Sequence, residues 1–388
     1  MTSGAHPDPL GWHRARDVAA AAASFLGVEN VALDEAIGRI LGNDLRALTD
    51  VPHYASSAMD GWAVSGAGPW QLVDGPVLGA GLAAIIVTGG AIPGGTDAVL
   101  RSESGVVHAG RLEAVSSKGE PHPRQHIRGS GEEARSGDLV VRAGRLLNPA
   151  HIALAAGCGH DLLGVVRRPR VGLLLTGDEV EVRGLPGPGR VRDSFGPQLP
   201  AVLRMLGAEV DTPRRVRDDF DATVAAIRES SGAAEVIVTT GGTGASAADH
   251  LRSALGFLGA EFLVPRVAMR PGGPSMLARL PDGRLVVGLP GNPLAAMMGL
   301  LTLAAPLLSA FQGRAAELAQ VTSAADLEGR AASSILVPFR SERGLAVANP
   351  WLGSGMMRGL ADAEGVLVVP PGGVRAGGAV ETLTLPWV

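Results

Sequence analysis

The sequence of 388 residues predicts a multidomain protein in which a central doubly wound α/β domain is accompanied by β-rich accessory domains. Strand-like and helix-like segments alternate between residues 167 and 315, which predicts the α/β domain. Short turn-rich strands fill residues 49–130, and residues 316–388 alternate as the short strands of a C-terminal β domain.

Composition and charge narrow the classes of protein. The hydrophobic share of 46% excludes wholesale disorder. The formal net charge of −4 and the isoelectric point near 6.2 lack the basic excess of nucleic-acid-binding proteins, so no nucleic-acid partner is expected. The only cysteine, Cys158, excludes an intrachain disulfide and a cysteine zinc cluster.

Two apolar segments resemble membrane elements, and the sequence favours core helices for both. The segment HRARDVAAAAASFLGVE is interrupted by Asp17 and continues into the amphipathic VALDEAIGRIL, so residues up to about 48 are predicted to be helical. The uncharged run PLAAMMGLLTLAAPLLSAF, residues 293–311, is nearly long enough to span a bilayer. Because it follows a glycine loop and contains Pro306, we predict a helix buried in a core or subunit interface, and no membrane partner.

The element order in the second half of the chain predicts the doubly wound domain. After the helical segment RLLNPAHIALAAGCG, the apolar run VGLLLTG is typical of a buried strand. The segments that follow alternate in type: DSFGPQLPAVLRMLG, AEVDTPRRV, DDFDATVAAIRESSG, EVIVTT and ADHLRSALGFLG. Such alternation predicts a mostly parallel sheet whose ligands bind beyond the carboxyl ends of its strands.

A glycine loop stands at one of these strand ends, in EVIVTTGGTGASAAD, residues 235–249. Glycines let the main chain approach a ligand closely, and the free amides at a helix N-terminus point toward negative charge. The loop therefore predicts a cradle for a phosphate or another oxyanion. The alternative, left open by this stretch alone, is a strand-to-helix turn in which glycine only relieves strain.

Common nucleotide-binding and hydrolase motifs do not fit. Gly242, Gly244 and Ala247 match a dinucleotide fingerprint, but Glu261 begins the next strand instead of ending it. No lysine follows the glycines, as a Walker loop requires. No HExxH or GxSxG motif supports a zincin or hydrolase reading.

Carboxylates recur at the predicted loop ends. Asp178 and Glu179 directly follow a strand, Asp218 and Asp219 precede a helix, and Asp60 and Asp249 lie in loops rich in small residues. Acids gathered beside a phosphate cradle suggest a magnesium-assisted phosphate reaction. Taken singly, Asp60 and Asp249 are also consistent with turn or helix caps, and Asp218 with Asp219 with a helix start.

Several motifs in fixed order carry a family resemblance. They are SAMDGWAV, VTGGAIPGGTDAVL, HIRGSGEEARSGD, RRPRVGLLLTGDEV, VRDSFGPQL, VTTGGTGASAAD, RPGGP and GLPGNPLAA. In this order they closely resemble molybdopterin molybdenumtransferases of the MoeA type, which act in molybdenum cofactor biosynthesis. The tail SGMMRGLADAEGVLVVPPGGVRAGGAV is similar to the C-terminal β domain of that family. The resemblance covers nearly the whole chain.

The resemblance implies a transferase that inserts molybdate into the dithiolene of adenylylated molybdopterin, with Mg²⁺, and releases AMP. It further implies an elongated, cytoplasmic homodimer of four-domain subunits, in which residues 1–48 and 131–166 together form an elongated linker or N-terminal domain. The expected partners beyond a second copy are the pterin nucleotide, molybdate, the molybdopterin adenylyltransferase and the apoproteins of molybdoenzymes.

Site residues follow from the same resemblance, motif by motif. The catalytic residues implied are Asp60, Glu179, Asp218 and Asp249, with Asp60 supplied by the partner subunit or a neighbouring domain. The magnesium ligands implied are Asp178, Glu179 and Asp249. The substrate-binding residues implied are Thr88, Thr240, Gly241, Gly242, Thr243, Gly244, Ser246, Arg270, Pro290 and Pro293.

The chain also departs from the family pattern. Ala55, Ser56 and Ser57 replace the usual Asp-Asn-Ser, and GGTGAS is closer to the related pterin adenylyltransferases than to the usual GGVSVG. Arg270 replaces a lysine and Gly273 deletes one, although Arg266 or Arg270 can supply the missing charge. Two alternatives therefore stay open: a molybdopterin adenylyltransferase, and a paralogue that binds the pterin nucleotide with reduced or no turnover.

Overall fold

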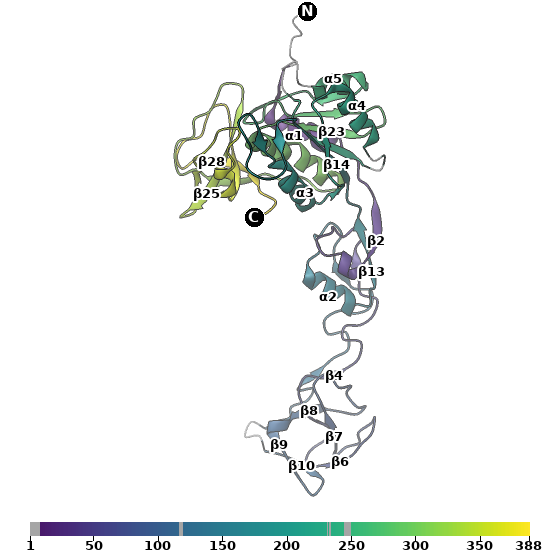
Figure 1. Cartoon of the computed structure of the whole chain (residues 1–388). Coiled ribbons are helices and arrows are strands. Elements are labelled where there is room, and N and C mark those ends of the chain that lie inside the picture. Colours follow the sequence, from purple (N-terminus) through teal and green to yellow (C-terminus); the bar gives the residue numbers. More distant parts are fainter. Residues whose placement is uncertain (1–7, 116–118, 231, 233, 244–249) are drawn as a thin grey trace, which may run out of the picture. The chain divides into compact units, whose positions relative to one another are not determined.

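The computed structural model describes residues 8–115, 119–230, 232, 234–243 and 250–388 (Figure 1). Its contacts divide the chain into two compact units. The first, here called the α/β unit, comprises the residues up to Gly27 and Arg167–Val388, and the second, the β unit, comprises Val28–Val166. The predicted four-domain boundaries are finer than this division and stay a prediction.

The β unit contains the short, turn-separated strands predicted between residues 49 and 130. Its main sheet has six strands in the order β8 (Ala98–Arg101), β5 (Gly61–Val64), β7 (Leu82–Ile86), β6 (Trp70–Leu72), β10 (Arg111–Ala114) and β9 (Gly105–His108). All neighbours are antiparallel except β6 and β7. Apolar side chains on both faces of the sheet form two small cores.

The rest of the β unit corrects one prediction. Residues 28–48 are not helical: β2 (Val28–Ala32) is a strand, followed by a short 3₁₀ turn, Leu33–Glu35. β2 pairs antiparallel with β13 (Leu162–Val166), more than a hundred residues later in the sequence. This long-range pairing overrides the local amphipathic pattern. The remaining elements are α2 (Pro149–Gly157), capped by Asn148, and the strand pairs β3 (Leu45–Arg46) with β12 (Leu139–Val141) and β4 (Ser56–Ser57) with β11 (Ile127–Arg128).

The α/β unit contains the predicted mostly parallel sheet. Its strands run in the order β17 (Glu209–Val210), β14 (Arg170–Thr176), β19 (Val236–Thr240), β23 (Leu285–Leu289), β22 (Met276–Arg279) and β20 (Glu261–Val264), with β18 (Arg214–Val216) also on β14. The strands from β17 to β23, and β18, are parallel, whereas β22 forms an antiparallel hairpin with β23. The doubly wound prediction is confirmed.

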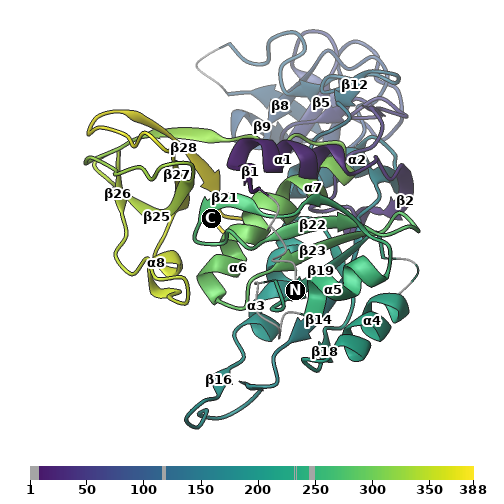
Figure 2. The ribbon, with the colours of Figure 1, turned by 90° about the horizontal axis from the view of Figure 1, so that it is seen from above.

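Helices cover both faces of this sheet (Figure 2). One face packs against α4 (Phe220–Glu229) and α5 (His250–Phe257). The other packs against α3 (Phe195–Met205), α1 (Trp12–Ala21) and a long apolar helix. Both faces are apolar, which is why strands such as β19 have no exposed side chains.

The long apolar helix consists of α6 (Pro293–Gly299), a π-helical segment (Leu300–Ala304) and α7 (Ala305–Phe311). By length and composition it could cross a membrane, but 83% of its most apolar window is buried inside the protein. The prediction of a buried core helix is confirmed. Because the run is buried within its own chain, it does not require a subunit interface.

Helix α1 holds the π-helical segment of this apolar helix. The Nε1 of Trp12 donates to the Oγ1 of Thr302 at 3.0 Å, and Nη1 of Arg16 donates to the carbonyl of Leu301 at 2.9 Å. A π-helical turn leaves main-chain groups without their regular partners, and Arg16 satisfies one of them. Burial lowers the pKa of Arg16 to about 10, so its guanidinium stays charged at neutral pH.

The C-terminal β domain is a second sheet in the α/β unit. Its order is β1 (Leu10–Gly11), β21 (Val267–Arg270), β25 (Ser334–Glu342), β27 (Gly365–Val369), β28 (Ala379–Thr384) and β24 (Ala319–Thr322), with β26 (Leu345–Ala348) on β25. Thus two strands from outside residues 316–388 complete it. The short helix α8 (Arg358–Ala361) and the two-residue strands β15 (Val180–Glu181) and β16 (Val191–Arg192) lie outside the main sheets.

Candidate active site

A cavity of about 780 Å³ opens at the carboxyl ends of β14, β19 and β23 in the α/β unit. Ligands of doubly wound folds bind at such strand ends. Seven of the residues predicted for the site line this cavity: Glu179, Asp218, Gly241, Gly242, Thr243, Pro290 and Pro293. They come from four separate loops, so the fold brings together what the sequence keeps apart.

The glycine loop forms one wall of the cavity, and its shape requires glycine. Gly241 and Gly242 have positive φ angles of 79° and 63°. A Cβ atom at Gly241 would lie 2.5 Å from the Oγ1 of Thr176. A larger residue would therefore displace the Thr176 side chain. The amide of Gly241 donates to the carbonyl of Leu289 at 2.9 Å, so the amides that the loop can present to an anion are those of Gly242 and Thr243. Gly244, Ser246 and Asp249 lie outside the described residues.

Two threonines just before the loop have buried, unpartnered hydroxyls. Thr239 is 2% exposed and Thr240 is fully buried. Within the described part of the chain, neither Oγ1 has a hydrogen-bond partner. Neither threonine lines the cavity of about 780 Å³; Thr239 lines a separate small pocket on the α4–α5 side of the sheet, so these hydroxyls are not ligands of the candidate site.

Asp218 of the cavity pairs with Asp178, which does not itself line the cavity. The amide of Asp178 donates to Oδ2 of Asp218 at 3.0 Å, and the amide of Asp218 donates to Oδ1 of Asp178 at 3.4 Å. This reciprocal contact ties the loop after β14 to the loop after β18. No group of three or more His, Cys, Asp or Glu side chains that could hold a metal ion occurs among the residues that the structure describes, which leave out Asp249.

The structure gives different roles to Asp218 and Asp219, which the sequence alone could not distinguish. The Oδ1 of Asp219 accepts from the amide of Ala222 at 2.8 Å and caps α4. Asp218 makes no such cap bond and lines the cavity instead. The capping interpretation therefore holds for Asp219 and not for Asp218.

Sequence reasoning missed Asp193, which also lines the cavity. Its side chain is buried, accepts from the amides of Phe195 and Gly196 at 3.0 Å each, and forms an ion pair with Arg215. The amides that begin α3 are thus already neutralised, which leaves the glycine loop as the better anion site. The signal was present in VRDSFGP, where an acid stands directly between a strand and a helix.

A second cavity, of about 540 Å³, shares Pro274, Pro290 and Asn292 with the first. Arg266 and Arg270 line it, so Arg270 belongs to this second cavity rather than to the first. Neither guanidinium has a hydrogen bond or ion pair with any residue in the described ranges. Two unpaired cations make this cavity attractive to anions.

Gly273 lies in the same cavity wall. A Cβ atom there would approach the carbonyl oxygens of Met269 at 3.1 Å and Val267 at 3.4 Å. A lysine at this position would therefore be crowded by the main chain. Together with the two free guanidinium groups, this favours the view that arginines already supply the charge that Gly273 deletes.

Asp60 and Thr88, the remaining predicted site residues, belong to the β unit. The amide of Thr88 donates to Oδ1 of Asp60 at 2.7 Å. The hydrogen bonds from Thr88 lower the pKa of Asp60 below its ordinary value. These hydrogen bonds favour the ionised carboxylate, which is suited to contact a cation and is a weaker proton acceptor than an ordinary aspartate.

Two protein-family models match most of the chain. Residues 11–159 match a family model described as the MoeA N-terminal region, domains I and II. Residues 172–310 match a model described as a probable molybdopterin binding domain. The second match contains the cavity-lining loops after β14, β18, β19 and β23.

Relatives match over most of their length. The molybdopterin molybdenumtransferase of Staphylococcus aureus strain Mu50 is 29% identical over 91% of this chain and 90% of its own, and that of Staphylococcus epidermidis is 28% identical over the same shares. Two structures of the molybdopterin biosynthesis MoeA protein of Pyrococcus horikoshii superpose with TM-scores of 0.78 and 0.75. They are 27% and 20% identical, and each comparison covers 97% of this chain and at least 99% of the other. The two family models, the full-length relatives and the shared fold together show that the chain belongs to the MoeA family of molybdopterin molybdenumtransferases.

Proposed function

We propose that this protein is a molybdopterin molybdenumtransferase of molybdenum cofactor biosynthesis, which inserts molybdate into the dithiolene of adenylylated molybdopterin and releases AMP. The observation that carries the proposal is the cavity at the strand ends, whose lining brings Gly241, Gly242 and Thr243 together with the carboxylates of Glu179 and Asp218. This set of groups suits a ligand that carries both phosphates and a bound cation.

The two cavities would bind different substrates. The amides of Gly242 and Thr243 in the glycine loop would hold the phosphates of the pterin nucleotide. Arg266 and Arg270 in the adjoining cavity would hold molybdate, a dianion, next to the nucleotide. Because the cavities share a wall at Pro290 and Asn292, both substrates would lie close together without leaving the protein.

The donor set fits Mg²⁺. This ion binds oxygen ligands, keeps several waters and usually takes one or two carboxylates together with substrate phosphates. Asp178 and Asp218 already stand side by side, and Glu179 lines the same cavity. Because no three acids of the described residues form a metal-binding group, we propose that the pair Asp178 and Asp218 and the substrate phosphates would hold the ion, with Glu179 and Asp249 as further candidate ligands. The ion would neutralise the charge of the phosphates. Asp60, ionised by its Thr88 contact, would serve as a further carboxylate of the reaction.

One assay separates this function from its alternatives. The purified protein is incubated with adenylylated molybdopterin, Mg²⁺ and molybdate, and AMP is measured with and without molybdate. Molybdate-dependent AMP release is the expected result. Adenylylation of molybdopterin by ATP would instead show an adenylyltransferase, and tight binding without either reaction would show a paralogue that only binds the nucleotide.

We also propose that the protein acts as a cytoplasmic homodimer in which the β unit of one subunit completes the site of the other. The support is the family assignment and the exposed, ionised Asp60 and exposed Thr88 of the β unit. The buried apolar helix does not contribute to this proposal. The adenylyltransferase and molybdoenzyme apoproteins are the partners that a cofactor of this kind would need before and after the reaction.

Mixed dimers test the shared site. We expect Asp60→Ala and Asp218→Ala to be inactive alone, because each lacks a carboxylate of every site. After subunit exchange, a mixed dimer keeps one intact site, so activity should return to about a quarter of the wild-type level at equal amounts with random pairing. Exchange is verified with two affinity tags. Proven exchange without any recovery would contradict a site shared between subunits.

The arginine cavity gives a second prediction. Arg270→Gln should weaken molybdate binding by about 10-fold at low ionic strength, since it removes one charged hydrogen-bond donor from the anion. The difference should shrink as salt screens the attraction. Arg279→Gln is the matched control, because Arg279 pairs with Glu261 at 3.7 Å outside both cavities. Titrations at two salt concentrations measure this, and equal affinities for the two variants would remove Arg270 from the site.

A further inference from the structure

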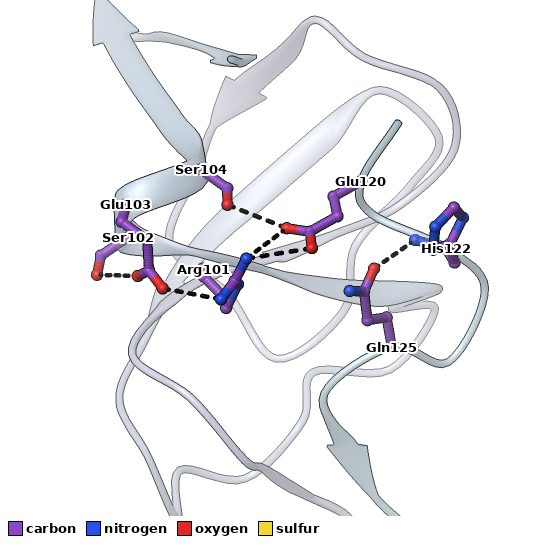
Figure 3. A network of polar contacts seen from close by, with 7 residues as sticks. All are labelled: Arg101, Ser102, Glu103, Ser104, Glu120, His122 and Gln125. Atoms are coloured by element: carbon purple, nitrogen blue, oxygen red, sulfur yellow. Dashed lines mark hydrogen bonds and ion pairs between the residues drawn. The ribbon is translucent and has the colours of Figure 1, made fainter. Parts of the chain in front are cut away.

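A half-buried ion pair lies in the β unit at the end of β8 (Figure 3). Nη2 of Arg101 donates to both carboxylate oxygens of Glu120 at 3.1 Å, and Oγ of Ser104 donates to Oε2 at 3.0 Å. The Glu120 side chain is only 10% exposed. The Arg101 guanidinium lowers the pKa of Glu120, so the carboxylate is ionised and held by charge-assisted bonds.

On one side, this ion pair is connected to the main chain of Asp60. Arg101 is the last residue of β8, and the amide of the next residue, Ser102, donates to the carbonyl oxygen of Asp60 at 3.0 Å. Gly61 lies so close to β8 that a Cβ atom would meet the carbonyl oxygen of Leu100 at 2.0 Å. The main chain that carries the Asp60 carboxylate is therefore pressed against the end of β8.

On the other side, residues 120–126 connect Glu120 to a hydrogen bond with the residues just before Asp60. The carbonyl of His126 accepts from the amide of Ala58 at 2.8 Å, and β11 pairs with β4 directly before that point. Residues 119–126 contain no helix or strand, and Arg124 and His126 have positive φ angles of 63° and 60°. Left-handed backbone at non-glycine residues is unfavourable and persists only where the surroundings fix it.

The contacts thus close a ring from Arg101 through Ser102, Asp60, Ala58 and His126 back to Glu120. We propose that Arg101 and Glu120 are positioning residues for Asp60: their ion pair holds the two chain segments between which the Asp60 loop is fixed. The proposal rests on the proposed function only for the role of Asp60 in catalysis. Two main-chain hydrogen bonds also join these segments, from the amide of Val99 to the carbonyl of Gln125 at 3.0 Å and from the amide of Arg124 to the carbonyl of Asp97 at 2.7 Å. Loss of the ion pair therefore loosens the ring without separating the segments, and the Asp60 carboxylate is held less firmly on the amide of Thr88.

Amide hydrogen exchange of the full chain tests the ring without any need for turnover. We expect Glu120→Gln to make the amides of Ala58, Ser102 and Thr88 exchange about 10-fold faster, as loss of a charge-assisted hydrogen bond predicts. Amides of the β9–β10 hairpin serve as the internal reference. Glu103→Gln is the matched control, because Glu103 contacts the same Arg101 at 3.1 Å but its side chain is 59% exposed and lies outside the ring.

The kinetic arm measures molybdate-dependent AMP release by the same variants. Glu120→Gln should lower kcat by about 10-fold while KM for the pterin nucleotide stays near the wild-type value, because only the position of Asp60 has changed. Glu103→Gln should match the wild type in both quantities. If wild-type protein releases no AMP, the proposed function fails, but the exchange result still supports or overturns the ring.

Two outcomes overturn the proposal. The first is equal exchange of the three amides in Glu120→Gln and Glu103→Gln. The second applies if Glu120→Gln unfolds the β unit, which faster exchange of the reference hairpin would reveal. In that case Ser104→Ala, which removes one of the three hydrogen bonds to the carboxylate, replaces it. Unchanged exchange at Thr88 in that milder variant would then overturn the ring.

Discussion

Asp218→Ala is expected to lower molybdate-dependent AMP release by about 100-fold or more, the size of effect seen when a charged group that contacts the reacting centre is removed. Asp218 lines the cavity, and its carboxylate accepts the amide of Asp178 from the opposite loop. Its removal deletes one candidate magnesium ligand and frees the loop that carries another. Both effects act on the site rather than on the core.

The control is the adjacent residue. Asp219→Ala should keep nearly full activity but lower the free energy of unfolding by about 1 kcal/mol, because it removes the cap of α4. Asp218→Ala should show the reverse, with little loss of stability. Chemical denaturation and the AMP assay, run on both variants, measure the two quantities.

Two results would contradict this assignment. Near-normal AMP release from folded Asp218→Ala would remove the residue from the site. Equal loss of activity in both variants would mean that the whole turn between β18 and α4 is needed only for structure. Asp249→Ala is expected to resemble Asp218→Ala if both acids act in one site.

Trp12→Ala is expected to have the largest effect on stability, a loss of about 3–5 kcal/mol for the α/β unit. The indole is 2% exposed within the main core and donates to Thr302 in the π-helical segment. Its removal leaves a cavity where α1 covers the long apolar helix and leaves the Thr302 hydroxyl without its donor. Urea unfolding followed by circular dichroism measures the loss.

Trp12→Phe separates packing from hydrogen bonding. It keeps most of the ring volume and removes the Nε1 donor, so we expect a loss of about 1 kcal/mol. If Trp12→Ala were no less stable than Trp12→Phe, α1 would not be part of the core. Such a result would also reopen the question of what covers the apolar helix.

The sequence by itself determined the elements whose signals are local. Strands β14, β19 and β23 carry apolar side chains on both faces, so their sequences predict strands that are buried on both sides. The glycine loop was recognisable because few other residues adopt the backbone of Gly241 and Gly242. The order of these elements then placed Glu179, Asp218 and the loop at one edge of the sheet.

Only the tertiary structure decided features that depend on distant partners. Residues 28–32 carry a helical pattern, yet they form β2 because β13 offers a pairing that no local signal encodes. Asp218 and Asp219 are identical in type and adjacent, and only the direction of each side chain distinguishes a cavity residue from a helix cap. Arg266 and Arg270 flank and end β21, and both line the second cavity because β21 belongs to the C-terminal sheet and not to the α/β sheet. Local propensities and motifs depend on residues that are close in the sequence, so the sequence alone reveals them. Strand register, side-chain direction and shared cavities depend on contacts between segments that are far apart in the sequence.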